Sequence, residues 1–375
     1  MINKGNYITA DCYADHFSSS YCFFKDNKTY NGKAGEEQVR KRTRNHNLSI
    51  KGIFKLGNRH KLSVGTEYIV DVLKSQTDNI AKEDAYTLAL FAQDEIKLLR
   101  NLQALIGVRY IYHENFKNHA TPNVALMYKP GKFNFRASYA AGFRTPTLSE
   151  LYATDIAKKN DRLTIGNLDL KPEKNNYFSL SAEYVHERFS VSVNAFYNNI
   201  RDMIDYNTIA TGDKAMEQYG HKEVRQRDNI AEAKVHGINV SANAYLGAGF
   251  NLSGGYTHLN TQDVELEQPI DKSIKNAYNI NAQWAHSWKI YRLNINLNGR
   301  INSKRFSKSY GYAPEYQLWD LNTRHSFNLK SVIIEPGFGM ENLFDYMDDR
   351  PYNSNYATLT PGRSFYISLS LKFKS

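Results

Sequence analysis

The segment from Phe143 to Tyr152, Phe-Arg-Thr-Pro-Thr-Leu-Ser-Glu-Leu-Tyr, concentrates residues that could bind a ligand or brace a loop. Arg144 and Glu150 carry opposite charges and are close enough in sequence to form an ion pair. Pro146 fixes the backbone φ angle between them. The segment therefore either shapes the start of a long loop or helps that loop close over a ligand. Its six candidate residues are Phe143, Arg144, Pro146, Glu150, Leu151 and Tyr152.

Two histidines, His113 and His119, flank a polar stretch and are candidate iron ligands, because imidazole nitrogens commonly bind transition metals. The alternative interpretation is that both are solvated loop residues. The sequence contains no Gly-x-Ser-x-Gly elbow, no phosphate-binding glycine loop and no His-Glu-x-x-His motif. These absences indicate a protein that is not an enzyme and that holds no cofactor of its own.

The elements that must position these residues are strands, because apolar and polar side chains alternate with the period of a β-strand. At the C-terminal end, Phe365, Ile367, Leu369, Leu371 and Phe373 alternate with serines, a tyrosine and a lysine. The same alternation recurs over residues 133–139, 191–197, 238–244, 278–284 and 293–297. A soluble antiparallel sheet also alternates. The recurrence, with Asn, Ser, Gln and Arg on the polar face, favours an all-β transmembrane antiparallel barrel with a wet interior.

Composition supports a β-structured chain and excludes a helical membrane protein. The 375 residues include 27 Tyr and 19 Phe but only 9 Pro, and aromatic residues favour strands. Mean hydropathy is −0.59, and no apolar run approaches the roughly 18 residues that a membrane helix needs. The net charge of +10 comes without any recognisable nucleic-acid-binding module, so no nucleic-acid partner is expected.

The densest basic run places Arg40, Arg42 and Arg44 in register with Leu48 and Ile50 further along the chain. On one strand, the arginines would continue the lipid-facing row. Arginine at the bilayer midplane costs about 2–4 kcal/mol, and the cost falls toward zero at the interface. We therefore expect the arginines on the outer rim, where they could contact lipopolysaccharide phosphates. An ordinary basic loop is the alternative.

Two cysteines, Cys12 and Cys22, are ten residues apart, which is roughly 33 Å on one strand. A disulfide requires Cα atoms within about 7 Å. The cysteines can pair only if the chain turns between them, so we expect free thiols.

Short turns alternate with mostly longer polar connections along the chain, as they do in outer-membrane barrels. The count of strands between them is about sixteen. Short turns are expected near residues 57–59, 99–101, 129–131, 186–187, 247–249, 287–289 and 329–330. Longer connections are expected near residues 26–35, 75–83, 115–121, 142–173, 206–229, 261–273, 303–314 and 346–362.

Five blocks resemble TonB-dependent outer-membrane receptors, and they occur in that family's order. Residues 142–152 resemble the motif G-F-R-x-P-x-x-x-E-L-Y, and residues 167–173 resemble the box N-x-x-L-K-P-E. Residues 197–204, 229–237 and 341–345 resemble further family blocks. The resemblance covers roughly residue 87 to the end and implies a receptor of the siderophore, haem or cobalamin class in the outer membrane of a Gram-negative bacterium.

This family's fold implies a barrel of about 22 strands with an N-terminal plug that connects to TonB. Nothing in residues 1–375 resembles the plug, the TonB-contacting segment or a signal peptide. We therefore expect the chain to be the C-terminal portion of the barrel, with TonB reached through the missing region and a surface lipoprotein as a further partner. The implied function is TonB-dependent uptake of a large scarce nutrient. A self-contained porin of about sixteen strands is the alternative.

The resemblance does not select the ligand, which could be an iron chelate, haem or cobalamin. Haem receptors of this family often carry a histidine between F-R-A-P and N-P-[N/D]-L boxes, and none lies between residues 143–146 and 167–170 here. Arg136 and Arg300 fall on predicted interior rows. In the family's setting they would contact the plug or attract an anionic ferric chelate.

Overall fold

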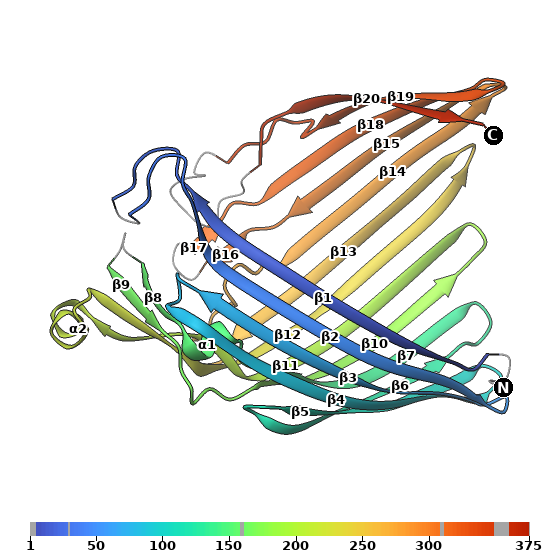
Figure 1. Ribbon diagram of the computed structural model, residues 1–375. Coiled ribbons are helices and arrows are strands. Elements are labelled where there is room, and N and C mark those ends of the chain that lie inside the picture. The colour runs from blue at the N-terminus through green and yellow to red at the C-terminus, as the bar shows by residue number, and fades with distance from the viewer. Residues whose placement is uncertain (1–4, 29–30, 158–160, 308–310, 349–359, 375) are drawn as a thin grey trace. The chain divides into compact units, whose positions relative to one another are not determined.

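A computed structural model describes residues 5–28, 31–157, 161–307, 311–348 and 360–374 of the chain, which form strands almost throughout (Figure 1). Sixteen of the strands are ten residues or longer. Their bounds are β1 Tyr7–Cys22, β2 Glu37–Leu56, β3 His60–Ser75, β4 Ile80–Leu99, β5 Leu102–His113, β6 Lys117–Tyr128, β7 Phe133–Arg144, β10 Glu173–Val185, β11 Phe189–Thr211, β12 Glu223–Gly247, β13 Phe250–Asp263, β14 Asn276–Trp288, β15 Tyr291–Asn302, β18 Tyr316–Asn328, β19 Val332–Glu341 and β20 Ser364–Phe373.

Four short strands and two short helices lie in the connections between the long strands. They are β8 Thr154–Ala157, β9 Arg162–Ile165, β16 Arg305–Ser307, β17 Gly311–Ala313, α1 Leu148–Tyr152 and α2 Gly212–Tyr219. No helix in the described ranges is both long and apolar enough to span a membrane. The same ranges contain no helical plug-like domain beside the strands.

Eighteen strands belong to one sheet, and β16 and β17 form a separate hairpin. Successive long strands pair antiparallel, as in β1 to β5 and β12 to β15. The short strand β9 instead runs parallel to the start of β12. The predicted all-β antiparallel fold with about sixteen long strands is thus confirmed.

The chain divides into two compact units. The first comprises Met1–Leu126, Ser138–Tyr177 and Asn199–Glu232, and it contains β1 to β5 and both helices. The second comprises Met127–Ala137, Phe178–Asn198 and Ala233–Ser375, and it contains β13 to β20. Each unit is therefore built mainly from neighbouring hairpins.

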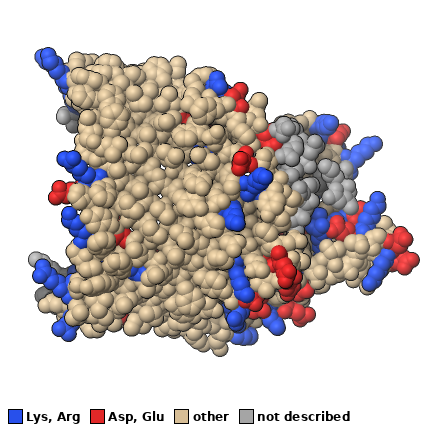
Figure 2. Space-filling view, turned by 180° about the vertical axis from the view of Figure 1, so that it is seen from behind, with Lys and Arg blue, Asp and Glu red and all other residues tan. Residues whose placement is uncertain are grey.

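The apolar rows of the long strands are exposed. In β20, Phe365, Ile367 and Leu369 are between 64% and 78% exposed. Apolar side chains are also exposed on other strands, for example Leu90 on β4 and Val193 on β11. Figure 2 shows a face on which most charged side chains lie toward the margins of a broad uncharged area. A water-soluble sheet would bury such rows, so they indicate a lipid-facing surface.

The opposite rows hold polar side chains that hydrogen-bond to one another. On β14 and β15, the amide nitrogen of Asn281 donates to the side-chain oxygens of Asn296 at 2.7 Å and Asn298 at 2.6 Å. On β18 and β20, the Tyr366 hydroxyl donates to Asn322. A polar row of this kind suits a wet surface, as the alternation predicts.

Aromatic rings gather near the short turns of the second unit. The Trp288 ring lies 5.6 Å from the Tyr291 ring, which in turn lies 5.0 Å from Phe327. Phe250 and Trp284 extend this group, with ring centroids 5.9 Å apart. Amphipathic rings collect at the membrane–water boundary, so this group marks that boundary at the short-turn end.

All seven short turns lie where the sequence predicts them, but three of the longer connections were predicted wrongly, and the one near residues 75–83 is a tight turn between Ser75 and Ile80. Residues 206–211 and 223–229 continue β11 and β12, and helix α2 occupies most of the gap between them. The strands continue because Ala210, Ala215 and Val224 form a small buried cluster within the polar stretch. The connection near residues 115–121 is a tight turn between His113 and Lys117. The predicted connection at 346–362 falls largely outside the described residues.

The two cysteines are unpaired, and Arg42 and Arg44, but not Arg40, lie on the row predicted for them, while their position on the outer rim stays a prediction. Cys12 and Cys22 lie on the same strand, β1, as free, exposed thiols. Arg42 and Arg44 lie on the exposed row that continues through Leu48 and Ile50. Arg40 departs from that row because the register with β1 shifts there, and its guanidinium lies over the ring of Tyr21.

Candidate functional site

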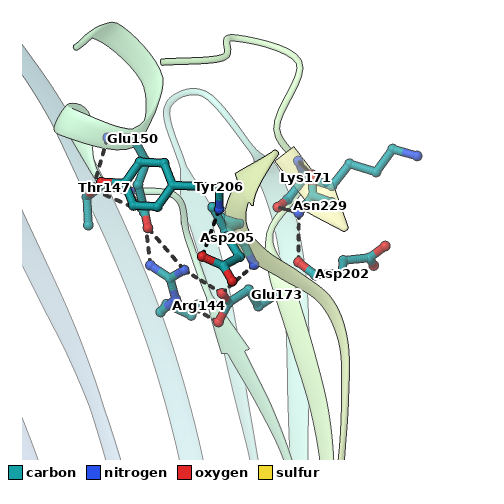
Figure 3. Close-up of polar contacts among 10 residues, drawn as sticks. Arg144, Thr147, Glu150, Lys171, Glu173, Asp202, Asp205, Tyr206 and Asn229 are labelled. Carbon is teal, nitrogen blue, oxygen red and sulfur yellow. Dashed lines mark hydrogen bonds and ion pairs between the residues drawn. The ribbon is translucent and has the colours of Figure 1, made fainter. Parts of the chain in front are cut away.

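Arg144, the last residue of β7, lies between two carboxylates (Figure 3). Its Nη1 donates to Glu150 Oε2 at 3.0 Å, and its Nε donates to Glu173 Oε2 at 2.7 Å. Glu173 Oε1 also accepts the backbone N–H of Ile204 at 2.9 Å. This Arg144 network joins β7, α1, β10 and β11, and it contains the predicted Arg144–Glu150 ion pair.

Helix α1 holds Glu150 in place through its N-terminal cap. The Thr147 hydroxyl accepts the backbone N–H of Glu150 at 3.2 Å, and the Glu150 carboxylate accepts the backbone N–H of Thr147 at 2.8 Å. This reciprocal arrangement is a capping box, which satisfies N–H groups that a helix start leaves unpaired. Pro146, just before the cap, is buried and sets the entry of the chain into the helix.

An apolar cluster lies beside the Arg144 network. Leu151, Leu170 and Ile204 are buried together, and Phe116 and Tyr152 pack against them. Leu151 and Tyr152 thus contribute packing rather than free surface. The cluster fixes α1 against the strands, which supports the interpretation that residues 143–152 shape the start of the loop.

Asn229 on β12 ties two further segments together. Its Oδ1 accepts the backbone N–H of Lys171 at 2.7 Å, and its Nδ2 donates to the backbone oxygens of Lys171 at 2.8 Å and Asp202 at 2.7 Å. Asp202 has φ of 55°, a left-handed conformation that costs non-glycine residues free energy. The Asn229 amide helps to hold this conformation, so one side chain secures both the chain before β10 and the irregular part of β11.

We predict that Asn229→Ala destabilises the connection before β10 by about 1–2 kcal/mol, because three hydrogen bonds to backbone groups are lost. Hydrogen exchange of the Lys171 amide should accelerate. Asn229→Asp keeps the acceptor oxygen but loses the donor N–H groups. Its Lys171 amide should exchange at a rate between those of the parent protein and of Asn229→Ala. Unchanged exchange in Asn229→Ala would contradict the role of this side chain.

The carboxyl group of Glu150 lies in α1, outside the long strands. Its burial acts to raise its pKa, but the hydrogen bonds from Arg144 and Thr147 outweigh the burial and hold the pKa below its usual range. A lowered folded-state pKa contributes stability that is present above the ordinary value of about 4.3 and is lost as pH falls through the lowered pKa.

We therefore predict that the loop anchored by Glu150 stays ordered from neutral pH down to about pH 5 and loosens only below about pH 4. Limited proteolysis across residues 145–172 by an acid-tolerant protease should show this transition. Glu150→Gln should remove most of the pH dependence. Loosening that begins between pH 6 and 7 would contradict the assignment.

Both candidate histidines have structural contacts around Phe116. His119 Nε2 donates to the Phe116 backbone oxygen at 2.9 Å, and its ring stacks on Phe143 with centroids 4.0 Å apart. The buried His113 accepts the backbone N–H of Asn115 at 3.1 Å and lies 5.1 Å from the Phe116 ring. No group of three His, Cys, Asp or Glu residues in the described ranges could hold a metal ion.

Arg136 and Arg300 are exposed, and neither shares a hydrogen bond with Arg144, Glu150 or Glu173 in the described residues. Arg136 on β7 has its guanidinium 3.4 Å from the sulfur of Met127. Arg300 on β15 is paired in register with Asn279 and Leu318. Whether these arginines, or residues 143–152, contact a ligand stays a prediction.

Sequence reasoning missed Glu173 and Asn229 as members of the site. Both lie inside blocks that resemble family motifs. The predicted partner Glu150 already satisfies the single positive charge of Arg144, so the sequence offers no reason to expect a second carboxylate. The signal that could have found them is the order of the blocks, because five separated blocks are best explained by contact with one another. The structure joins four of them through Arg144, Glu173, Ile204 and Asn229.

A family model described as "TonB dependent receptor-like, beta-barrel" matches residues 4–343 of the chain. Among solved structures, a mutant of the ferric enterobactin receptor PfeA from Pseudomonas aeruginosa is similar, with a TM-score of 0.78 and 18% identity. That match covers 98% of this chain and 59% of the receptor.

Two further structures have comparable similarity. The siderophore receptor PirA from Acinetobacter baumannii gives a TM-score of 0.72 at 16% identity, covering 98% of this chain and 63% of that one. The copper transporter OprC gives a TM-score of 0.72 at 11% identity, and the match covers 96% of this chain and 62% of OprC. The chain therefore spans less than two thirds of the length of each protein, and the likeness at this identity concerns the fold.

Proposed function

The chain belongs to the TonB-dependent receptor-like β-barrel family, and from that premise we propose that it serves the TonB-dependent uptake of a large scarce nutrient. TonB-dependent receptors are transporters and not enzymes, and they lie in the outer membrane of Gram-negative bacteria, which is the localisation of this chain. The family match and the structural neighbours do not favour the porin alternative.

The observation that carries this proposal is the Arg144 network, since it brings family-like blocks that are distant in sequence to one place. Arg144, Glu150 and Glu173 brace the connection of residues 145–172 at its base. In this proposal the network positions the loop, and the loop covers the ligand.

For the ligand we propose an iron–siderophore complex ahead of haem or cobalamin. The support is that PfeA is described as a ferric enterobactin receptor and PirA as a siderophore receptor, whereas the two boxes that flank a histidine in haem receptors flank none here. Arg136 and Arg300 would supply positive charge toward an anionic chelate. His113 and His119 would shape the loop base through Phe116 rather than bind iron.

For partners we propose TonB, reached through a plug region that this chain does not contain, and a barrel completed by further strands. The solved receptors are longer than the chain by more than a third of their own length. In this proposal residues 1–375 supply the C-terminal portion of the barrel. A surface lipoprotein that delivers the ligand is a further proposed partner.

Deleting the gene that encodes this chain from its source bacterium tests the proposal. We expect lost growth on a ferric siderophore as sole iron source, with growth on haem and cobalamin retained. Collapsing the proton gradient with a protonophore should abolish the same uptake in the parent strain. Uptake that survives the protonophore, or a deletion phenotype limited to small sugars, would support the porin instead.

A further inference from the structure

A patch of three exposed cations lies on the lipid-facing row of the first unit. Arg42 and Arg44 are alternate residues of β2, and Lys74 on β3 is directly opposite Arg42. Arg44 is opposite Val72 on β3 and His16 on β1. Directly opposite residues in an antiparallel pair have Cβ atoms about 5 Å apart on the same face, so the three cations form one cluster, the outer cationic patch.

The outer cationic patch has no compensating acid. Like charges directly opposite each other destabilise a strand pair, and Arg42 and Lys74 are such a pair. Across the described ranges, no carboxylate forms an ion pair with any of the three cations. Asp84, on the same face of β4 opposite Val72, is paired with Lys82 at 2.9 Å. Arg44 Nε instead donates to His16 Nδ1 at 3.2 Å, which fixes its guanidinium.

The level of the patch relative to the membrane follows from the strand register. A row of tyrosine rings, Tyr68, Tyr86 and Tyr112, crosses β3 to β5 with centroids 6.0 and 6.1 Å apart. Tyr86 on β4 is directly opposite Val70 on β3, and Arg44 on β2 is directly opposite Val72. Arg44 therefore lies two residues, about 7 Å, further along the strands from the short turn than the tyrosine row. Tyrosine rings collect at the membrane boundary, and the patch therefore lies at the level of lipid headgroups.

The exposed aliphatic residues between the patch and the short turn favour a lipid over a soluble anion as the ligand. Leu48 and Ile50 continue the row of Arg42 and Arg44 toward the short-turn end and are both exposed. A lipid whose headgroup contacts the cations would lay its acyl chains along these residues. A soluble anion would use only the polar part of the surface.

We propose that Arg42, Arg44 and Lys74 bind a phosphate group of a phosphorylated outer-leaflet glycolipid, the chemistry of lipopolysaccharide. The guanidinium forks can bind phosphate oxygens bidentately, and the lysine ammonium adds a point charge. The phosphate relieves the repulsion between Arg42 and Lys74. This site is separate from ligand uptake, because it lies on the membrane-facing side of β2 and β3.

Native mass spectrometry of the full chain in detergent, titrated with bisphosphorylated lipid A or its dephosphorylated form, tests the site. The variant R42Q/R44Q/K74Q should bind the bisphosphorylated lipid at least tenfold more weakly, since each basic residue near an anionic lipid contributes roughly fivefold. The variant R42K/R44K keeps charge but loses the forks and should be intermediate. The matched control R59Q/R100Q/K330Q removes three exposed cations at the short turns and should bind as the parent does.

Heat-modified gel mobility and circular dichroism identify which variants are folded, and only those are compared. Equal binding of the dephosphorylated lipid would overturn the proposal, as would equal weakening in the short-turn control. Inorganic phosphate at the same concentration as the lipid should not displace it. Displacement would assign the patch to a free anion and overturn the lipid assignment.

Discussion

Arginine in place of Val193 is expected to reduce the free energy of folding into a bilayer by about 2–4 kcal/mol. Val193 lies four residues into β11 from the short turn, and its side chain is 40% exposed on the apolar row. If that row faces hydrocarbon, a guanidinium there loses its hydration near the middle of the membrane. Denaturant titration of folding into lipid vesicles measures the loss.

Asn194→Arg is the matched control, because the neighbouring residue presents its side chain to the opposite face of the same strand. We expect a change within about 1 kcal/mol, as for lumen positions. Equal losses in the two variants would mean that the apolar row does not face lipid.

The sequence predicts the strands and their faces well because the period of two is a local property. Once Leu48 and Ile50 are known to face lipid, the parity rule places Arg42 and Arg44 on the same row, and the structure agrees. The rule fails at Arg40, because the register shift between Ser19 and Ser20 is set by pairing with another strand. No alternation within β2 alone could reveal it.

The site is harder to predict because its contacts are long-range. Arg144 and Glu150 are six residues apart, and their pairing follows from sequence proximity. Glu173 is 29 residues from Arg144, and Asn229 is 58 residues from Lys171. Charge alone cannot select which of the many Asp and Glu residues pairs with Arg144. Only the antiparallel pairing of the strands brings these particular residues together.

The Arg144 network gives the second large expected effect, a loss of about 2–3 kcal/mol of local stability in Arg144→Gln. The side chains of Glu150 and Glu173 are only 12% and 15% exposed. Without the guanidinium, these two acids face each other across a poorly hydrated gap. Breaking a buried pair costs about 3–5 kcal/mol, and the 42% exposure of the Arg144 side chain reduces that figure.

Hydrogen exchange over residues 145–172, read separately from global unfolding, measures the effect of Arg144→Gln. The triple variant Arg144→Gln, Glu150→Gln, Glu173→Gln removes the unpaired charges together and should recover at least half of the lost protection. Recovery would show that carboxylate repulsion dominates the loss. If residues 145–172 exchange as fast in the triple variant as in Arg144→Gln, the loss comes instead from the missing hydrogen bonds of Arg144. In either case the braced loop depends on one arginine at the end of β7, and protection unchanged in Arg144→Gln would remove that dependence.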